Sequence, residues 1–130
     1  MSFLLDTQHL LWLFIEPEKI TKPRVNLLLD EKNNIYFSQV SLWEISIKYK
    51  LRKLKLGGGT PEDFYHVVEN SFLHCLLLEN TVLISSYQLP LLHKDPFDRL
   101  LIWQSICNDL SFISSDRSIG DYIKYNLKLA

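Results

Sequence analysis

Short, mostly apolar runs alternate with helix-forming segments along nearly the whole chain, and this alternation most constrains the fold. Four such runs are Phe3–Leu5, Ile35–Phe37, Cys75–Leu78 and Leu110–Ser114. Runs without polar alternation are typical of parallel strands, whose two faces are both covered by the connecting helices. The sequence therefore predicts an α/β fold, a single-domain α/β/α sandwich with a mostly parallel central sheet.

Helix start signals lie between these runs. Thr60 followed by Pro61 and two acids predicts a helix start, and Asp95 with Pro96 opens a helix so apolar that it should be central and buried. The segment from Ser41 also alternates as a strand would, but a helical stripe and the capping-box spacing to Glu44 favour a helix. The expected helices are 8–15, 22–29, 41–51, one from Thr60, 81–87, 95–107 and one from about Ser118, before a possible edge strand at 127–129.

Length, composition and cysteine usage limit the classes of protein that fit. The 130 residues suit one domain, 1–130, and a net charge of −1 argues against a uniformly positive surface for nucleic acid. Cys75 and Cys107 lie in apolar runs, which predicts two buried thiols in a reducing compartment. The apolar stretch Leu10–Ile15 is much shorter than the roughly 20 residues of a membrane span. We therefore expect a cytoplasmic protein without a membrane segment or signal peptide.

Four carboxylates lie at the ends of predicted strands or the starts of predicted helices, and we expect these positions to be close together in the fold. Asp6 ends the first strand and Asp116 ends a late strand, while Glu44 and Asp98 lie in the first turns of two helices. The carboxyl ends of parallel strands share one edge of the sheet, where ligands bind. Taken singly, each acid also has a structural explanation, as a turn residue, a helix cap or the ion-pair partner of Lys48.

Together, four converging carboxylates would repel one another unless a cation lies among them. Hard oxygen ligands without a Cys or His cluster indicate Mg²⁺ or Mn²⁺ and argue against tetrahedral zinc. Magnesium with few protein ligands commonly serves phosphate substrates. The chemistry expected here is metal-assisted hydrolysis of a phosphodiester, with water as the nucleophile.

The segments that carry these acids resemble a known family, the PIN-domain ribonucleases, and particularly the VapC-type toxins of bacterial type II toxin–antitoxin systems. The matching segments are 4–7 with 10–12, 40–45 with 47–48, 95–102 and 114–117, in the family's order and spacing across almost the whole chain. The resemblance implies an endoribonuclease toxin that hydrolyses RNA and is neutralised by a cognate antitoxin.

The resemblance also implies roles for individual residues. Asp6, Glu44, Asp98 and Asp116 would be the catalytic, metal-binding acids, and Thr7, Ser114, Ser115 and Asp95 would support the site as hydroxyls and a helix cap. One position departs from the family's pattern, because Gln8 occupies the place where relatives often carry His, and His9 follows it. We expect this change to modulate the site without abolishing metal binding.

Cationic side chains near the motifs are candidates for substrate binding. Arg99 and Arg117 flank two of the acids and could hold a phosphate or pair with neighbouring carboxylates. A dense cationic stretch could contact RNA phosphate or form a solvated helix face, and its members are Lys48, Lys50, Arg52, Lys53 and Lys55.

The remaining aromatic and apolar residues have structural interpretations. His66, His74 and His93 show no spacing typical of metal ligands, and Trp12, Trp43 and Trp103 are expected in the core. Helices 8–15 and 22–30 carry more apolar side chains than one covered face needs. We expect part of that surface to serve a homodimer and an antitoxin helix, as the resemblance implies.

Two other classes of protein fit parts of the pattern. A phosphoacceptor receiver domain also has an acidic pocket on a parallel sheet, but it needs paired acids after its first strand and a lysine after a late strand. This chain has Asp6 alone and Asp116 at those places. A non-catalytic interaction module on the same fold would typically lack one of the four acids, and none is missing here.

Overall fold

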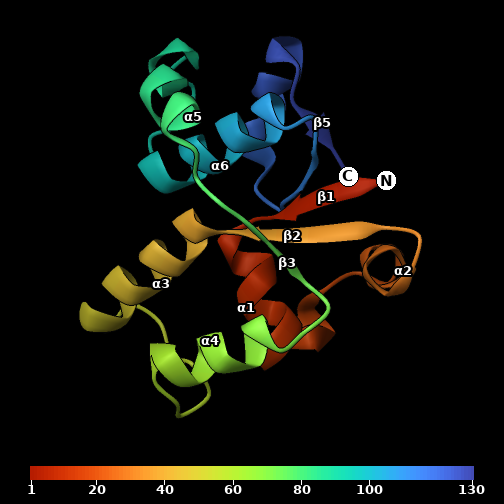
Figure 1. The fold of residues 1–130 in the computed structure, drawn as a ribbon, viewed down its shortest axis with the longest axis vertical. Helices are drawn as coiled ribbons and strands as arrows, with labels where there is room; N and C mark the ends of the chain where they lie inside the picture. Colours follow the sequence, from red (N-terminus) through yellow and green to blue (C-terminus); the bar gives the residue numbers. More distant parts are fainter.

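The computed structural model describes residues 1–130 and contains one sheet of five strands (Figure 1). The strands are β1 (Ser2–Leu5), β2 (Asn34–Ser38), β3 (His74–Leu76), β4 (Ser111–Ile113) and β5 (Lys128–Leu129), in the order β3-β2-β1-β4-β5. Central Leu4 of β1 lies opposite Tyr36 of β2 on one side and Phe112 of β4 on the other. All four pairings are parallel, which confirms the predicted α/β class.

Helices cover both faces of this sheet (Figure 1). They are α1 (Thr7–Ile15), α2 (Lys22–Leu29), α3 (Gln39–Lys50), α4 (Pro61–Glu69), α5 (Asn80–Ser85) and α6 (Pro96–Cys107), with 3-10 helices η1 (Pro17–Lys19), η2 (Ser86–Gln88) and η3 (Arg117–Tyr125). In Figure 1, α1, α2 and α4 lie on one side of the sheet, and α5 and α6 lie on the other. No helix combines the length and the apolar character that a bilayer crossing requires.

The two cores follow from the period-two alternation of the strands. Phe3 and Leu5 point into the core beneath α1, α2 and α4, whereas Leu4 points into the core beneath α6 and η3. Ile113 and Phe112 of β4 divide in the same way. Each such side chain, when fully buried, contributes about 1.5–3 kcal/mol to folding. The central strands are therefore secured on both faces, and their carboxyl ends form a rigid edge.

Helix α3 forms where a helix was expected, but its start and end differ from the prediction. Ser38 is the N-cap, because its hydroxyl accepts a hydrogen bond from the Val40 N–H at 3.0 Å. Ser41 is therefore an interior residue, and its spacing to Glu44 is not a capping box. The helix ends at Lys50, since Arg52 adopts a left-handed conformation with φ 58°.

Burial corrects several expectations about cysteines and tryptophans. Cys75 and Cys107 are both exposed, because β3 is an edge strand and residue 107 ends α6. Trp43 is 62% exposed and packs edge-to-face on Phe97, whereas Trp12 and Trp103 are partly buried against the cores. Sequence patterns report the helical face of a side chain but not what covers that face.

The expected surplus of apolar surface on α1 and α2 is mostly covered. Leu10 and Leu28 are buried, and the apolar residues 11–15 and Leu27 pack against the same core, so Leu29 alone is strongly exposed. Exposed apolar side chains gather instead along α5, η2 and the loop after it, at Leu83, Ile84, Tyr87, Leu91 and Leu92. The helix expected from about Ser118 is a 3-10 helix, η3, at residues 117–125.

Candidate functional site

One cavity of about 350 Å³ gathers the acids at the carboxyl edge of the sheet. Asp6 follows β1, α3 follows β2 directly, and Asp116 follows β4, so the parallel strands deliver all three elements to the same edge. The start of α6 completes the cavity. Its lining comprises Asp6, Thr7, Gln8, Leu11, Glu44, Lys48, Lys53, Leu54, Asp95, Asp98, Ser115 and Asp116. The four candidate acids therefore lie together.

Asp6 is held by the start of α1. It is the N-cap of this helix, and its Oδ1 accepts a hydrogen bond from the His9 N–H at 2.7 Å. The same Oδ1 lies 2.9 Å from His9 Nδ1. No hydrogen bond engages the other carboxylate oxygen, Oδ2, and Asp6 lines the cavity. One oxygen of Asp6 is thus committed to the fold while the other is available to a ligand.

The hydrogen-bond partners of His9 indicate its tautomer. Its side chain is 1% exposed, and Arg24 Nη1 lies 3.2 Å from Nε2. Because a guanidinium can only donate and an ionised carboxylate can only accept, Nε2 is the acceptor and Nδ1 carries the proton. Arg24 also donates to the Ser115 hydroxyl at 3.0 Å and to the Ser114 carbonyl at 2.7 Å. Arg24 on α2 therefore links Asp6, after β1, to the loop that carries Asp116.

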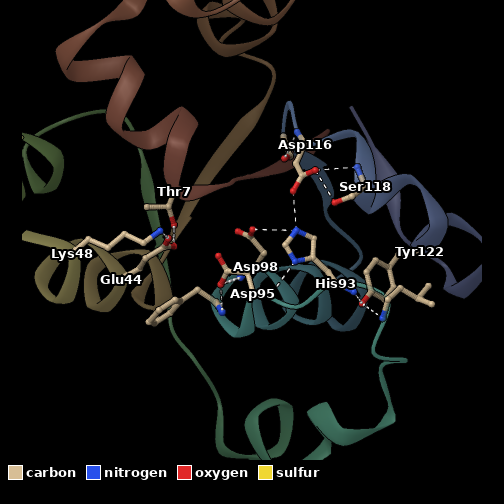
Figure 2. A network of polar contacts seen from close by, with 12 residues as sticks. Thr7, Glu44, Lys48, His93, Asp95, Asp98, Asp116, Ser118 and Tyr122 are labelled. Atoms are coloured by element: carbon tan, nitrogen blue, oxygen red, sulfur yellow. Dashed lines mark hydrogen bonds and ion pairs between the residues drawn. The ribbon is translucent and has the colours of Figure 1, made fainter. Parts of the chain in front are cut away.

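Glu44 is buried at the cavity beside two hydroxyls. Thr7 Oγ1 lies 2.6 Å from Glu44 Oε1 (Figure 2). It also lies 2.9 Å from Ser41 Oγ. Since a hydroxyl has one proton, Thr7 donates to the carboxylate and accepts from Ser41. Lys48, one helical turn beyond Glu44, forms an ion pair with its Oε2. The carboxylate is thus compensated by one cation that is itself partly exposed.

Several acids of the cavity affect the pKa of Lys48. Burial acts to lower its pKa, but the hydrogen bond to Glu44 and the attraction of Glu44, Asp95 and Asp98 outweigh that effect. The net result is a raised pKa for the ammonium group. Lys48 therefore stays charged and partly neutralises the cavity.

Asp95 and Asp98 have different environments although one short motif carries both. Asp95 is the N-cap of α6, as predicted, and its Oδ1 accepts from the Phe97 N–H at 2.8 Å. Asp98 lies in the first turn and faces the cavity (Figure 2). Burial, followed by repulsion from Asp95, Glu44 and Asp6, raises the pKa of Asp98 to about 7, although His93 acts against this rise. The cavity therefore carries more negative charge than its lysines compensate.

His93 contacts two of the acids, and the sequence analysis missed it. Its Nε2 lies 2.8 Å from Asp116 Oδ2 and 3.5 Å from Asp98 Oδ2, and its Nδ1 accepts from the Asp95 N–H at 3.0 Å (Figure 2). The hydrogen bonds of His93 and Ser118 lower the pKa of Asp116. The available signal was position, because His93 lies two residues before the predicted cap Asp95.

The loop that carries His93 is braced by a buried tyrosine. The Tyr122 hydroxyl accepts from the Leu92 and His93 N–H groups, each at 2.9 Å, and donates to the Pro90 carbonyl at 2.7 Å. Tyr122 is completely buried beneath this loop. The imidazole is therefore positioned by η3, an element nearly thirty residues away in the sequence.

Several predicted substrate-binding residues lie away from the acids. Arg99 lines a different cavity beside α5 and η2, Lys50 lines a third cavity, and Arg117 is exposed at the start of η3 without lining the acidic cavity. Ser115 lines the acidic cavity, whereas the Ser114 hydroxyl accepts from the Asp116 N–H at 3.1 Å. Of the proposed cations, Lys48 and Lys53 line the acidic cavity, and Lys48 alone forms an ion pair with one of the acids.

The donor set of this cavity fits a hard divalent cation. Five carboxylates and two lysines line it with no thiol, and the imidazole of His93 contacts two of the carboxylates. Such oxygen-rich sets are typical of Mg²⁺ or Mn²⁺ sites. Ligand atoms of His93, Asp98 and Asp116 lie within 4.8 Å of one another, and burial followed by repulsion from neighbouring acids raises the pKa of Asp98. The residues present are therefore compatible with a bound divalent ion.

Comparison with solved structures supports the same fold. VapBC2 from Rickettsia felis, solved with a promoter DNA fragment, has a chain with a TM-score of 0.72 at 18% identity, covering 100% of this chain and 98% of that one. VapBC-1 from nontypeable Haemophilus influenzae gives 0.68 at 17% identity, covering 100% and 97%. FitAcB from Neisseria gonorrhoeae gives 0.63 at 18% identity, covering 99% and 96%. Comparison with curated proteins found no match to this sequence.

Comparison with protein families separates two of the classes considered above. Residues 3–124 match the family described as PIN domain. The match spans both halves of the sheet and every candidate acid, and it argues against a phosphoacceptor receiver domain. The protein belongs to the PIN domain family.

Proposed function

We propose that the protein is a Mg²⁺-dependent endoribonuclease toxin of the VapC type, neutralised by a cognate antitoxin. PIN domains are in general nucleases that use divalent metal ions, which supports hydrolysis of nucleic acid. The observation that carries the proposal is the acidic cavity, where Asp6, Glu44, Asp98 and Asp116 face one another at the edge of the sheet. In this proposal the four acids hold Mg²⁺ or Mn²⁺.

The bound cation would supply charge neutralisation and polarisation of water and phosphate. The residues of the chain prepare for this in specific ways. His9 and the N-cap bond fix Asp6, so Oδ2 needs little reorganisation when a ligand arrives. Thr7 orients Glu44, and Asp95 positions the first turn that carries Asp98. Lys48 at the rim offers a cation to a substrate phosphate.

RNA as the substrate and an antitoxin as the partner are parts of this proposal. The neighbours of similar fold are VapBC and FitAcB structures, which supports a protein partner for this chain as well. A basic side chain of that partner would be attracted to the five carboxylates and could block them. The proposal also includes a homodimer, for which the exposed apolar side chains of α5 and η2 are candidates, and a cytoplasmic location.

A cleavage assay tests the function directly. Purified protein should cut a labelled single-stranded RNA internally with Mg²⁺, and chelation with EDTA should stop the reaction. Asp116→Asn should remove the activity while the circular dichroism spectrum is unchanged. Asp109→Asn is the matched control, because Asp109 is an exposed acid outside the cavity whose left-handed backbone Asn tolerates. Equal activity of wild type and Asp116→Asn would refute the proposal.

The partner is tested by co-expression. A gene adjacent to this one should encode a small protein that co-purifies with the chain and suppresses both RNA cleavage and growth arrest. Failure of every adjacent gene to do either would refute the antitoxin part while leaving the nuclease part intact.

A further inference from the structure

A second cavity lies beside the acidic one, where α3 ends and α4 begins. It is the larger of the two, at about 720 Å³. Its lining comprises Ser46, Tyr49, Lys50, Arg52, Leu54, Lys55, Thr60, Pro61 and Glu62, and we call it the Tyr49–Lys55 groove. Leu54 lines this groove and the acidic cavity as well, and Lys53 lines the acidic cavity. The two cavities are therefore neighbours that share a wall.

The cations of the Tyr49–Lys55 groove have no partners within the protein. Lys50, Arg52 and Lys55 form neither an ion pair nor a side-chain hydrogen bond, although Glu62 lines the same groove. By contrast, Lys48 is paired with Glu44 and Lys128 with Asp109. Three uncompensated cations around one concave surface favour an anionic ligand.

Arg52 occupies a position that would suit glycine better. It follows the C-cap of α3 with φ 58°, the Arg52 N–H donates to the Tyr49 carbonyl at 3.0 Å, and the Lys53 N–H donates to the Lys48 carbonyl at 2.8 Å. These bonds form a Schellman motif, whose left-handed position favours glycine because it has no Cβ. A long cation at a position that favours glycine points to a role for its side chain.

Tyr49 adds an aromatic face to the groove. Its side chain lines the groove and is 38% exposed, beside Lys50 on the last turn of α3. Nucleobases stack on such rings whatever their identity, while lysine and arginine hold the flanking phosphates. Aliphatic side chains, which a docked protein helix would need as anchors, are limited to Leu54 and Pro61. This composition favours nucleic acid over a protein partner.

We propose that the Tyr49–Lys55 groove binds single-stranded RNA next to the cleavage site, with a base on Tyr49 and phosphates on Lys50, Arg52 and Lys55. The inference rests on the proposed function, because it treats the acidic cavity as the place of cleavage. A strand held in the groove passes Leu54 and Lys53 to reach the acids. The groove thereby positions the substrate and does not itself react.

Binding is tested with the full chain and a fluorescent single-stranded RNA of twelve mixed nucleotides, without divalent metal so that no cleavage occurs. Arg52→Gly should weaken binding about fivefold or more and reduce the slope of log K against log salt by roughly 0.7 per lost phosphate contact. Its melting temperature should stay equal or rise, because glycine relieves the strained backbone. Opposite effects on binding and stability would separate a binding role from a structural one.

Two matched controls accompany this variant. Tyr49→Ala should weaken RNA binding several-fold, whereas Tyr49→Phe keeps the ring and should bind as wild type. Lys32→Gln removes a charge from the turn before β2, at the opposite edge of the sheet, and should change binding less than twofold. Wild-type affinity of both Arg52→Gly and Tyr49→Ala would overturn the inference.

Cleavage of the same RNA with Mg²⁺ distinguishes this inference from the proposed function. If wild type cleaves, Arg52→Gly should raise KM while kcat changes little. Cleavage with unchanged KM in the groove variants would refute the groove and leave the nuclease. Weakened RNA binding in the variants without cleavage by wild type would refute the nuclease and leave the groove. Loss of affinity for a poly-glutamate peptide alone would assign the groove to an acidic protein partner and refute the RNA proposal.

Discussion

The acidic cavity and the Tyr49–Lys55 groove are adjacent, yet they are built in opposite ways. Asp6 and Glu44 are buried and held by hydrogen bonds from helix α1, whereas the cations of the groove are exposed and unpaired. Carboxylates that must hold a cation gain from preorganisation, since reorganisation would weaken binding. Long cationic side chains that meet a flexible strand need less fixed geometry, because each phosphate contact is mainly electrostatic.

The two regions also differ in the electrostatic repulsion between their own charged side chains. Burial, together with repulsion between the carboxylates of the acidic cavity, raises the pKa of Asp98, and Lys48 compensates part of the negative charge. The groove avoids repulsion by exposing its lysines to water, where screening is strong. Changes in the cavity should therefore affect activity and metal binding steeply, while changes in the groove should be gradual and salt-dependent.

The largest expected effect comes from removing an acid that faces the cavity. Asp6→Asn keeps the Oδ1 acceptor that caps α1 but removes the negative charge. We expect RNA cleavage to fall more than about 100-fold, since metal-site residues outside direct contact already cost 10–100-fold. Single-turnover rates at saturating Mg²⁺, with Asp109→Asn as control, measure this. A loss below tenfold would mean that Asp6 belongs to the fold and not to the site.

Removing the hydrogen bond that His9, itself held by Arg24, makes to Asp6 should give the next largest effect. His9→Asn retains an N–H near the position of Nδ1, whereas His9→Leu removes the donor to Asp6. We expect His9→Leu to weaken Mg²⁺ binding about tenfold and His9→Asn to restore part of it. Calorimetric titration of Mg²⁺ gives the affinities. Identical Mg²⁺ affinity of the two variants would show that His9 only packs.

The stability of the metal-free protein should depend on pH. Because the pKa of Asp98 is raised to about 7 in the fold from 3.8, the folded state favours the protonated form. Stability is therefore greatest at low pH with respect to this group and is lost as pH rises from about 4 to about 7. Allowing for solvent screening of a partly exposed carboxyl, the loss is about 1–2 kcal/mol.

Thermal unfolding with and without Mg²⁺ measures this dependence. A divalent cation stabilises the ionised acids, so the Mg²⁺-induced rise in Tm should be larger at pH 8 than at pH 5.5. Asp98→Asn should flatten the pH dependence of the metal-free Tm between pH 4 and 7. A Mg²⁺ effect that is equal at both pH values would contradict the charge distribution described for the cavity.

The smallest effect is expected at Asp95, the cap of α6. Asn caps nearly as well as Asp, so Asp95→Asn should cost a few tenths of a kcal/mol at most and keep cleavage within about threefold of wild type. Asp98→Asn, three residues later, should remove most of the activity. Comparing the two variants in one cleavage assay separates the cap from the acid that faces the cavity. Equal losses would place both carboxylates in contact with the metal.

The sequence alone predicted the elements that depend on local chemistry. Apolar runs identified β1, β2 and β4, and Thr60 with Asp63 forms the capping box that starts α4. The sequence also predicts that Asp6, Glu44, Asp98 and Asp116 lie together, because parallel strands bring their carboxyl ends to one edge. Periodicity, caps and strand direction depend on residues that are neighbours in the sequence, so they can be inferred from the sequence alone.

Tertiary structure alone decided which other side chains join the acids. His93 reaches Asp116 across 23 residues, and Arg24 reaches Ser114 across 90, through contacts that no local pattern encodes. The separation of Lys48 from Lys50 has the same origin, since two residues on a helix point in opposite directions and only the packing of α3 shows which one faces the acids. Burial of Cys75 and Trp43 was misjudged because exposure depends on what covers a face, and the covering elements come from distant parts of the chain.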